Sequence, residues 1–397
     1  MSVASAPALS RRHLIVTWIS CTGSYCIANA TWWMQPVMID QLVGVRGLSA
    51  TGAGLVVSGE MTAMALTSYL LAKVLTGGRF LTLGAVGIAI ALLGSALSLK
   101  VQSFPLLVVT RCLTGFGEGF SFLVANTAII CFSDRDRAFA NMVVANVLFG
   151  VALVGLQPML PESHGVPSSL VALLIALALM TPTVFLTPPS SRLLPASAAT
   201  DSTSPTKHAR RMIALLCATT FIIGLASGIM WSFYGIIGKS TGLSDAGVNG
   251  AIATSILTAI IGSSAAAAVG NKWGRVRPVT IALALMTVAI VWLSFHPGPW
   301  GFRIATALNI STLYFIMPYL FAAGSVQDET GLGATYVGSA FLMTGAVSPF
   351  LGGILVDTVG TEIIGIVVVA TSILSWFLFA YVQRQSQDPT PVHLPSA

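Results

Sequence analysis

The sequence is dominated by apolar stretches long enough to cross a lipid bilayer, separated by short polar connections. A membrane-spanning helix needs about 20 largely apolar residues, and twelve segments of this chain meet that requirement. We expect helices at residues 14–42, 50–75, 80–99, 104–132, 138–160, 167–187, 210–238, 245–270, 278–296, 300–326, 333–356 and 361–382. These segments predict an all-α membrane protein with 12 transmembrane helices.

The low charge content supports this prediction. The chain has 19 basic and 13 acidic residues among 397, whereas charged residues make up about a quarter of a soluble globular domain. Most of the surface must therefore face a bilayer. The net charge of +6 does not indicate nucleic acid as a partner, because the basic residues occur in small groups between apolar segments rather than in a stripe with aromatic residues.

The cysteine pattern predicts neither a disulfide framework nor a metal site. The five cysteines all fall within apolar segments, their number is odd, and no CxxC or Cys/His spacing is present. We therefore expect no cofactor. The first apolar run is about 28 residues long and exceeds the 7–15 residues of a signal-peptide core, so we interpret it as the first spanning helix.

One long connection divides the chain into two sets of six helices. Residues 188–208 are rich in Pro, Ser, Thr and Ala, which is typical of a flexible segment, and we expect a cytoplasmic linker there between bundles at 1–187 and 209–397. Similar hexapeptides, 47–52 and 242–247, precede the second and eighth helices, and each places a serine where it can cap the helix that follows. Together with the matching helix counts, they indicate an internal duplication and two pseudo-symmetric bundles.

The distribution of Lys and Arg predicts the orientation in the membrane. If both termini lie on one side, that side collects 14 of the 19 basic residues. Cytoplasmic loops carry the excess of Lys and Arg. We therefore expect both termini in the cytoplasm and the protein in the cell (inner) membrane.

Three local motifs give the chain a resemblance to the major facilitator superfamily, of the prokaryotic 12-helix type. Residues 271–277 (NKWGRVR) resemble its loop signature, 111–117 (RCLTGFG) resemble its Arg-x-x-x-Gly-x-Gly pattern, and 345–353 (GAVSPFLGG) resemble its Gly-Pro element. The first-half counterpart of the loop signature, 73–79, lacks the acid. Residues 150–158 fit poorly to the Gly-Pro element that drug:proton antiporters carry in the fifth helix. The resemblance implies the fold and a transport function without setting substrate or direction.

Three ionisable residues lie inside the apolar segments: Glu60, Arg111 and Glu118. A charge at such depth costs about 2.5–3.5 kcal/mol on insertion scales. From the helix rise, Arg111 lies roughly 10 Å and Glu118 roughly 21 Å into the fourth helix, and Glu60 lies at an intermediate depth, roughly 16 Å into the second. Arg111 and Glu118 are seven residues apart and share a face.

Two functions are open for this cluster. If both glutamates were ionised the cluster would carry a net charge of −1, so desolvation favours one Arg⁺, one carboxylate and one carboxylic acid. Glu60 and Glu118 are thus candidates for proton coupling. The alternative is a buried ion pair that only holds two helices together, although such a pair needs a single acid.

The resemblance also implies that the first, fourth, seventh and tenth helices line a central cavity. The substrate-binding candidates are the polar and aromatic residues of these helices: Arg111, Tyr25, Asn29, Trp32, Gln35, Trp231, Tyr234, Asn309 and Tyr314. For each single aromatic residue, packing or a place in the interfacial belt is the alternative.

Charged loops are candidates for conformational latches. Arg79 is expected to meet Asp134 and Asp136, while Arg275 and Arg277 are expected to meet Asp328 and Glu329; Asn271 and Gly274 complete the loop signature. The alternative is solvated charges that contribute less than about 1 kcal/mol.

The sequence therefore predicts a secondary active transporter for a small organic solute, coupled to protons. A proton-driven efflux pump for a drug or secondary metabolite is the nearest alternative, and a non-transporting receptor or sensor on a transporter fold is an alternative of another class. An enzyme is not expected, because the helices carry no Ser/His dyad, His-Glu-x-x-His pattern or paired Asp. The expected partners are a small-molecule substrate, the proton and the lipid bilayer, and we expect a monomer.

Overall fold

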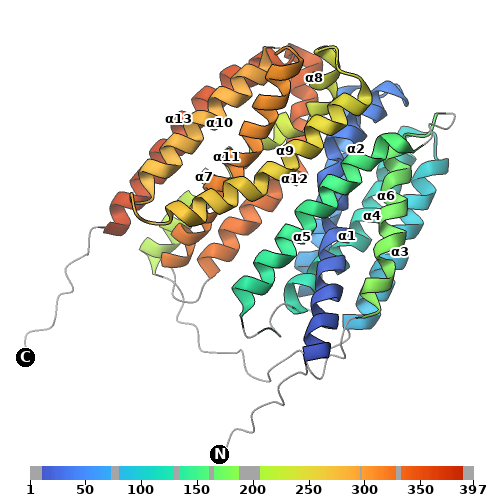
Figure 1. Cartoon of the computed structure of the whole chain (residues 1–397), viewed down its shortest axis with the longest axis horizontal. Helices are drawn as coiled ribbons and strands as arrows, with labels where there is room; N and C mark the ends of the chain where they lie inside the picture. The colour runs from blue at the N-terminus through green and yellow to red at the C-terminus, as the bar shows by residue number, and fades with distance from the viewer. Residues whose placement is uncertain are drawn as a thin grey trace, which may run out of the picture. The chain divides into compact units, whose positions relative to one another are not determined.

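The computed structural model describes residues 11–72, 80–128, 132, 134–160, 165–186, 206–295, 297–327 and 332–387. The regular elements of this part of the chain are helices (Figure 1). They are α1 (Arg11–Gly44), α2 (Ala50–Ala72), α3 (Phe80–Lys100), α4 (Phe104–Ala128), α5 (Arg135–Leu156), the 3-10 turn η3 (Gln157–Met159), α6 (Ser168–Val184), α7 (Lys207–Ser232), α8 (Tyr234–Ser240), α9 (Asp245–Val269), α10 (Val276–Ser294), α11 (Pro299–Val326), α12 (Leu332–Val359) and α13 (Glu362–Gln387).

These helices confirm the predicted all-α membrane fold. Ten helices of the described chain are long and apolar enough to cross a membrane, namely α2–α5, α7 and α9–α13. The apolar helix α6 is shorter, at 17 residues. Helix α1 has ample length at 34 residues, but it carries polar side chains along much of its course and many of them are buried. Polar residues of a spanning helix face the protein interior, so α1 is an inner helix of its bundle.

The predicted seventh helix, 210–238, is wrong as a single element. It is broken at Phe233 into α7 and α8. Residues of a continuous helix are set about 100° apart, so Phe233 would point roughly 200° away from Trp231. With the break, Trp231, Phe233 and Tyr234 are all buried.

The described chain belongs to two compact units. The first comprises Met1–Gln41 and Gly59–Ala198, and the second comprises Leu42–Ser58 and Ala199–Ala397. The start of α2 is therefore grouped with the C-terminal helices. The predicted bundles at 1–187 and 209–397 stay a prediction, and most of the predicted linker, 188–205, lies outside the described residues.

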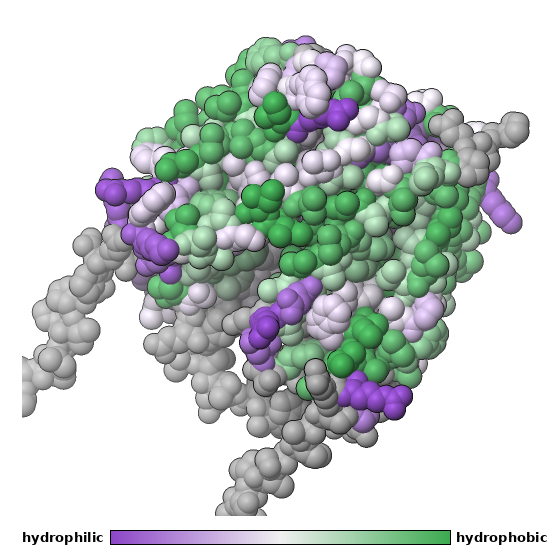
Figure 2. Space-filling view, viewed as in Figure 1, coloured by the Kyte–Doolittle hydropathy of each residue, from purple (hydrophilic) through white to green (hydrophobic). Residues whose placement is uncertain are grey.

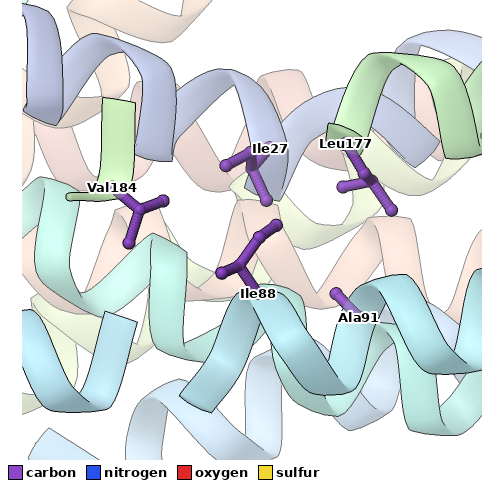
Figure 3. Packing of buried hydrophobic residues seen from close by; sticks show 5 residues of the cluster. All are labelled: Ile27, Ile88, Ala91, Leu177 and Val184. Carbon is purple, nitrogen blue, oxygen red and sulfur yellow. The ribbon is translucent and has the colours of Figure 1, made fainter. Parts of the chain in front are cut away.

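In the first unit, α3 packs against α4 and α6. Apolar side chains of three helices point toward one another in its core (Figure 3): Ile27 from α1, Ile88 and Ala91 from α3, and Leu177 and Val184 from α6. In the second unit, α11 packs against α9, α10 and α12, while α7 packs against α12 and α13.

The surface matches the solvent that these helices are expected to meet. Large apolar side chains such as Val109, Leu179 and Ile366 are each at least 60% exposed. Figure 2 shows broad apolar areas on the face in view. Such a surface would be unfavourable in water and is the one that lipid tails solvate.

The start of α2 is capped twice. The predicted cap by Ser49 is confirmed, because its hydroxyl accepts from Gly52 N at 3.0 Å. The carboxylate of Asp357, near the end of α12, accepts from Ala50 N at 3.1 Å and from Thr51 N at 2.8 Å. A carboxylate at this place satisfies otherwise unpaired N–H groups and complements the helix dipole. The equivalent cap of α9 by Ser244, which accepts from Gly247 N at 3.3 Å, is confirmed as well.

Helices α3 and α4 approach closely through glycines. A Cβ placed on Gly117 would lie 2.9 Å from Ala91 Cα, and one on Gly87 would lie 2.9 Å from Gly117 O. Real Cβ atoms essentially never show such distances. Small residues at this contact therefore allow the backbones of the two helices to meet, as is common between membrane helices.

Gly117→Ala is expected to destabilise the protein by about 1–3 kcal/mol, the cost of overpacking a tight contact. Thermal unfolding in detergent measures the loss. Gly250→Ala in α9 is the matched control, because a Cβ there meets no atom within 4 Å, and it should be neutral or slightly stabilising. Equal stability of the two variants would contradict the close-packing interpretation.

Candidate functional site

The three intramembrane charges predicted from the sequence meet in the first unit. Arg111 Nε donates to Glu60 Oε2 at 2.9 Å, and Arg111 Nη2 donates to Glu60 Oε1. The guanidinium thus binds the carboxylate with two parallel bonds, the strongest geometry for such a pair. The side chains of Glu60, Arg111 and Glu118 are completely buried.

A glycine of α4 allows this ion pair to form. Gly115 lies one helical turn after Arg111, and a Cβ there would be 3.0 Å from Glu60 Cα and nearer still to the Glu60 carbonyl. Helices α2 and α4 therefore touch backbone to backbone at this point. The Gly in the Arg-x-x-x-Gly-x-Gly pattern is what brings Glu60 within reach of Arg111.

Thr31 of α1 links the ion pair to Glu118 and is not among the residues predicted from the sequence. Its Oγ1 lies 2.9 Å from Glu60 Oε1 and 3.4 Å from Glu118 Oε1. The same oxygen accepts from Arg111 Nη2 at 3.3 Å. The available signal was the run of polar residues in the otherwise apolar first helix, but a single threonine among them does not reveal its partner.

Glu118 has no cation of its own among the described residues. Its Oε1 contacts Thr31, while its Oε2 has no hydrogen-bond partner in this part of the chain, and neither does Arg111 Nη1. The bidentate contact commits Arg111 to Glu60. A buried, unpaired carboxylate is costly, so the arrangement favours a neutral carboxylic acid at Glu118 and a cluster with no net charge.

The other predicted residues of α1 lie in the same unit. The ring of Tyr25 stacks on Phe122 of α4 at 6.1 Å between centroids, with Phe139 of α5 edge-on at 6.2 Å. Asn29 Nδ2 donates to Tyr25 O at 2.8 Å within the helix. Gln35 is buried and Trp32 is half-buried. Tyr25 is thus an aromatic packing residue in this structure, and its contact with substrate stays a prediction.

The predicted residues of the second unit form a separate polar network. Asn309 Nδ2 donates to Tyr234 Oη at 2.7 Å, and Ser227 Oγ donates to Asn309 Oδ1 at 3.2 Å. Trp231 packs edge-on against Tyr234, with 5.5 Å between centroids. These side chains are fully buried and contact one another, whereas Tyr314 is half-buried. In the described residues no cluster of His, Cys, Asp or Glu could hold a metal ion.

Comparison with known proteins identifies the fold. Residues 216–396 match the model of the Major Facilitator Superfamily, and more than nine-tenths of the chain is similar in structure to solved transporters of that fold. The C-terminal part of the chain thus matches the Major Facilitator Superfamily, and the chain shares its fold with solved transporters.

Two structures are of the nucleoside transporter NupG. A mutant form has a TM-score of 0.72 at 12% identity, with 93% of this chain and 99% of that chain covered; the other form has a TM-score of 0.69 at 14% identity, with 93% and 98% covered. A bacterial homolog of the human lysosomal transporter Spinster, inward-facing and unoccupied, has a TM-score of 0.66 at 16% identity, with 95% and 94% covered. Among curated protein sequences none matches this chain. The family match and the apolar helices indicate a multi-pass membrane protein.

The backbone conformation of the loop between α9 and α10 explains why the superfamily signature there contains a glycine. Gly274 has φ +69°, a left-handed conformation that glycine adopts without strain. Its N–H donates to Asn271 O at 3.1 Å and closes the turn. Tyr319 Oη of α11 donates to Gly270 O at 2.8 Å and holds the loop. Asn271 and Gly274 thus shape the loop that carries Arg275 and Arg277.

Both predicted latches include residues outside the described part of the chain. Arg79, Asp328 and Glu329 lie outside the described residues, as does the side chain of Asp136. Asp134 has a local role: it is the N-cap of α5, and its Oδ1 accepts from Arg137 N at 3.0 Å. A cap of this kind typically contributes about 1 kcal/mol, whether or not a latch also forms.

Proposed function

We propose that this protein is a transporter of the Major Facilitator Superfamily that moves a small organic solute by alternating access and is coupled to protons, with Glu118 as the group that binds and releases the proton. The observation that carries the proposal is the bidentate Arg111–Glu60 pair, which leaves Glu118 buried without a cation among the described residues. A purely structural ion pair has no use for this second acid.

The charge balance of the Glu60, Arg111 and Glu118 cluster links proton binding to the transport cycle. With Glu118 protonated, Arg111 and Glu60 cancel and the buried site carries no net charge. Loss of the proton leaves a charge of −1, which low-dielectric surroundings disfavour. Proton release therefore requires either water access to the site or a compensating positive group. Alternating exposure to the two sides of the membrane supplies the first, and a cationic substrate would supply the second.

Arg111 also offers a contact for a polar or anionic solute. Its Nη1 has no partner among the described residues, while its other two nitrogens hold Glu60 and Thr31. The two N–H groups of Nη1 on a fixed guanidinium suit a substrate oxygen. Uptake with a proton and export against a proton use the same chemistry at Glu118, and the sign of the driving gradient distinguishes them.

The similar structures suggest the first compounds for a screen. NupG is a nucleoside transporter by name, and at 14% identity the likeness concerns the fold. Nucleosides are therefore starting candidates, beside organic anions and amphiphilic cations. We further propose that both termini lie in the cytoplasm and that the protein resides in the plasma membrane, because 14 of the 19 basic residues then face inward.

Transport in proteoliposomes under imposed gradients tests the proposal. We expect at least one labelled solute to accumulate when a pH gradient is applied, and a protonophore should abolish this accumulation. Protein-free liposomes and an equal sodium gradient are the controls. Accumulation that follows sodium instead would overturn proton coupling. Specific binding of a solute without movement under any gradient would favour a receptor.

A further inference from the structure

We infer that Thr31 is a positioning residue that transmits the protonation state of Glu118 to the Arg111–Glu60 ion pair. This inference rests on the proposed function, since it assigns Glu118 as the proton-binding group. The observation behind the inference is that the buried Thr31 hydroxyl lies between two carboxyl groups and one guanidinium.

The three contacts of Thr31 use the full hydrogen-bonding capacity of its hydroxyl group. A threonine hydroxyl has one proton to donate and two lone pairs to accept with. Its oxygen lies 2.9 Å from Glu60 Oε1 and 3.4 Å from Glu118 Oε1, and it accepts from Arg111 Nη2 at 3.3 Å. The single proton cannot serve both carboxyl groups at once.

When Glu118 is protonated, all three contacts are compatible. The Glu118 hydroxyl donates to Thr31 Oγ1, which also accepts from Arg111 and donates its own proton to Glu60. Glu60 then has three donors: Arg111 Nε, Arg111 Nη2 and the Thr31 hydroxyl. The ion pair is held at its tightest in this state.

When Glu118 loses its proton, the same contacts conflict. Two carboxylates now compete for the one Thr31 proton. Glu60 keeps both bonds from Arg111, whereas Glu118 has no other donor in the described chain. The Thr31 hydroxyl therefore turns to Glu118, because a bond to an otherwise unpaired ion is the stronger gain. Glu60 loses one donor, and the link between α1 and α2 is released.

The groups that face Glu118 leave few other routes for this signal. Glu60 faces it from α2 and Arg111 faces it from α4. The contact from α1 is made by Thr31, and Cys112 of α4 lies beside Glu60 and Arg111. Thr31 is thus the hydroxyl through which α1 senses the charge of the cluster.

Infrared titration of the purified protein in lipid nanodiscs tests this role without a substrate. Wild type should show the C=O stretching band of a protonated carboxyl that disappears at high pH, and Glu118→Gln assigns the band by removing it. In Thr31→Val, which is nearly isosteric, the band should move to higher wavenumber, because the acid has lost its acceptor. The pH at which half of the band has formed should also shift, because the Thr31 hydroxyl no longer accepts from the protonated Glu118 or donates to its carboxylate.

Three further variants make the test specific. Thr31→Ser restores a hydroxyl and should return the band toward its wild-type position. Thr219→Val is the matched control: Thr219 is equally buried, but its hydroxyl donates to Leu215 O at 2.8 Å within α7. It should leave the band unchanged. If Thr31→Val does not fold, Thr31→Cys weakens the same contact and should shift the band in the same direction.

The outcomes separate this inference from the proposed function. A band that forms in wild type and keeps its position and midpoint in Thr31→Val or Thr31→Cys would overturn the role of Thr31 while leaving Glu118 as the proton site. No band that depends on Glu118 at any pH would overturn the proposed function itself.

Discussion

Glu118→Gln is expected to reduce proton-driven accumulation to equilibration, so that internal and external solute concentrations become equal. The amide resembles a protonated carboxyl in shape and lack of charge, so the cluster stays neutral and the helices keep their packing. It cannot release a proton, however, and the gradient no longer drives net movement. Exchange of labelled for unlabelled solute needs no net proton transfer and should remain measurable in the same proteoliposomes.

The control for this substitution is Glu362→Gln, in the first turn of α13 in the second unit. It also removes one carboxylate and should retain full accumulation. A Glu118→Gln protein that still concentrates solute against its gradient would show that coupling resides elsewhere.

Arg111→Ala is expected to cause the largest loss of stability, about 3–5 kcal/mol, which is typical when one partner of a buried ion pair is removed. The cost arises because Glu60 is left as a buried carboxylate without its cation. Expression level and thermal unfolding in detergent report the loss. Arg111→Ala/Glu60→Gln removes the stranded charge and should recover a large part of it.

Two control variants show whether the stability loss in Arg111→Ala comes from the buried ion pair. Lys239→Ala breaks an exposed ion pair with Asp245, at 2.9 Å, and should cost less than about 1 kcal/mol. Arg111→Lys keeps the charge but loses the planar fork, so it should fall between wild type and Arg111→Ala. A double variant no more stable than Arg111→Ala would mean that Arg111 is needed for contacts other than Glu60.

The membrane architecture could be predicted from the sequence because it depends on local properties. A segment of about 20 apolar residues specifies a spanning helix without reference to the rest of the chain. The caps at Ser49 and Ser244 and the turn at Gly274 are similarly local, since each depends on residues within one helical turn. The importance of Glu60, Arg111 and Glu118 was also visible, because a charge in an apolar segment has a cost wherever the helix packs.

Only the tertiary structure decided how these elements combine. The sequence left open which glutamate pairs with Arg111, because both lie at a suitable depth; the close contact of Gly115 with the backbone of Glu60 selects Glu60. Thr31 and Asp357 acquire their roles from helices far away in the chain, and the break at Phe233 lies among three buried aromatic side chains that the sequence did not place. Hydropathy acts on each segment separately and so determines where the helices are, whereas the partner of a buried polar group depends on the packing of whole helices and on side-chain geometry at a few ångströms.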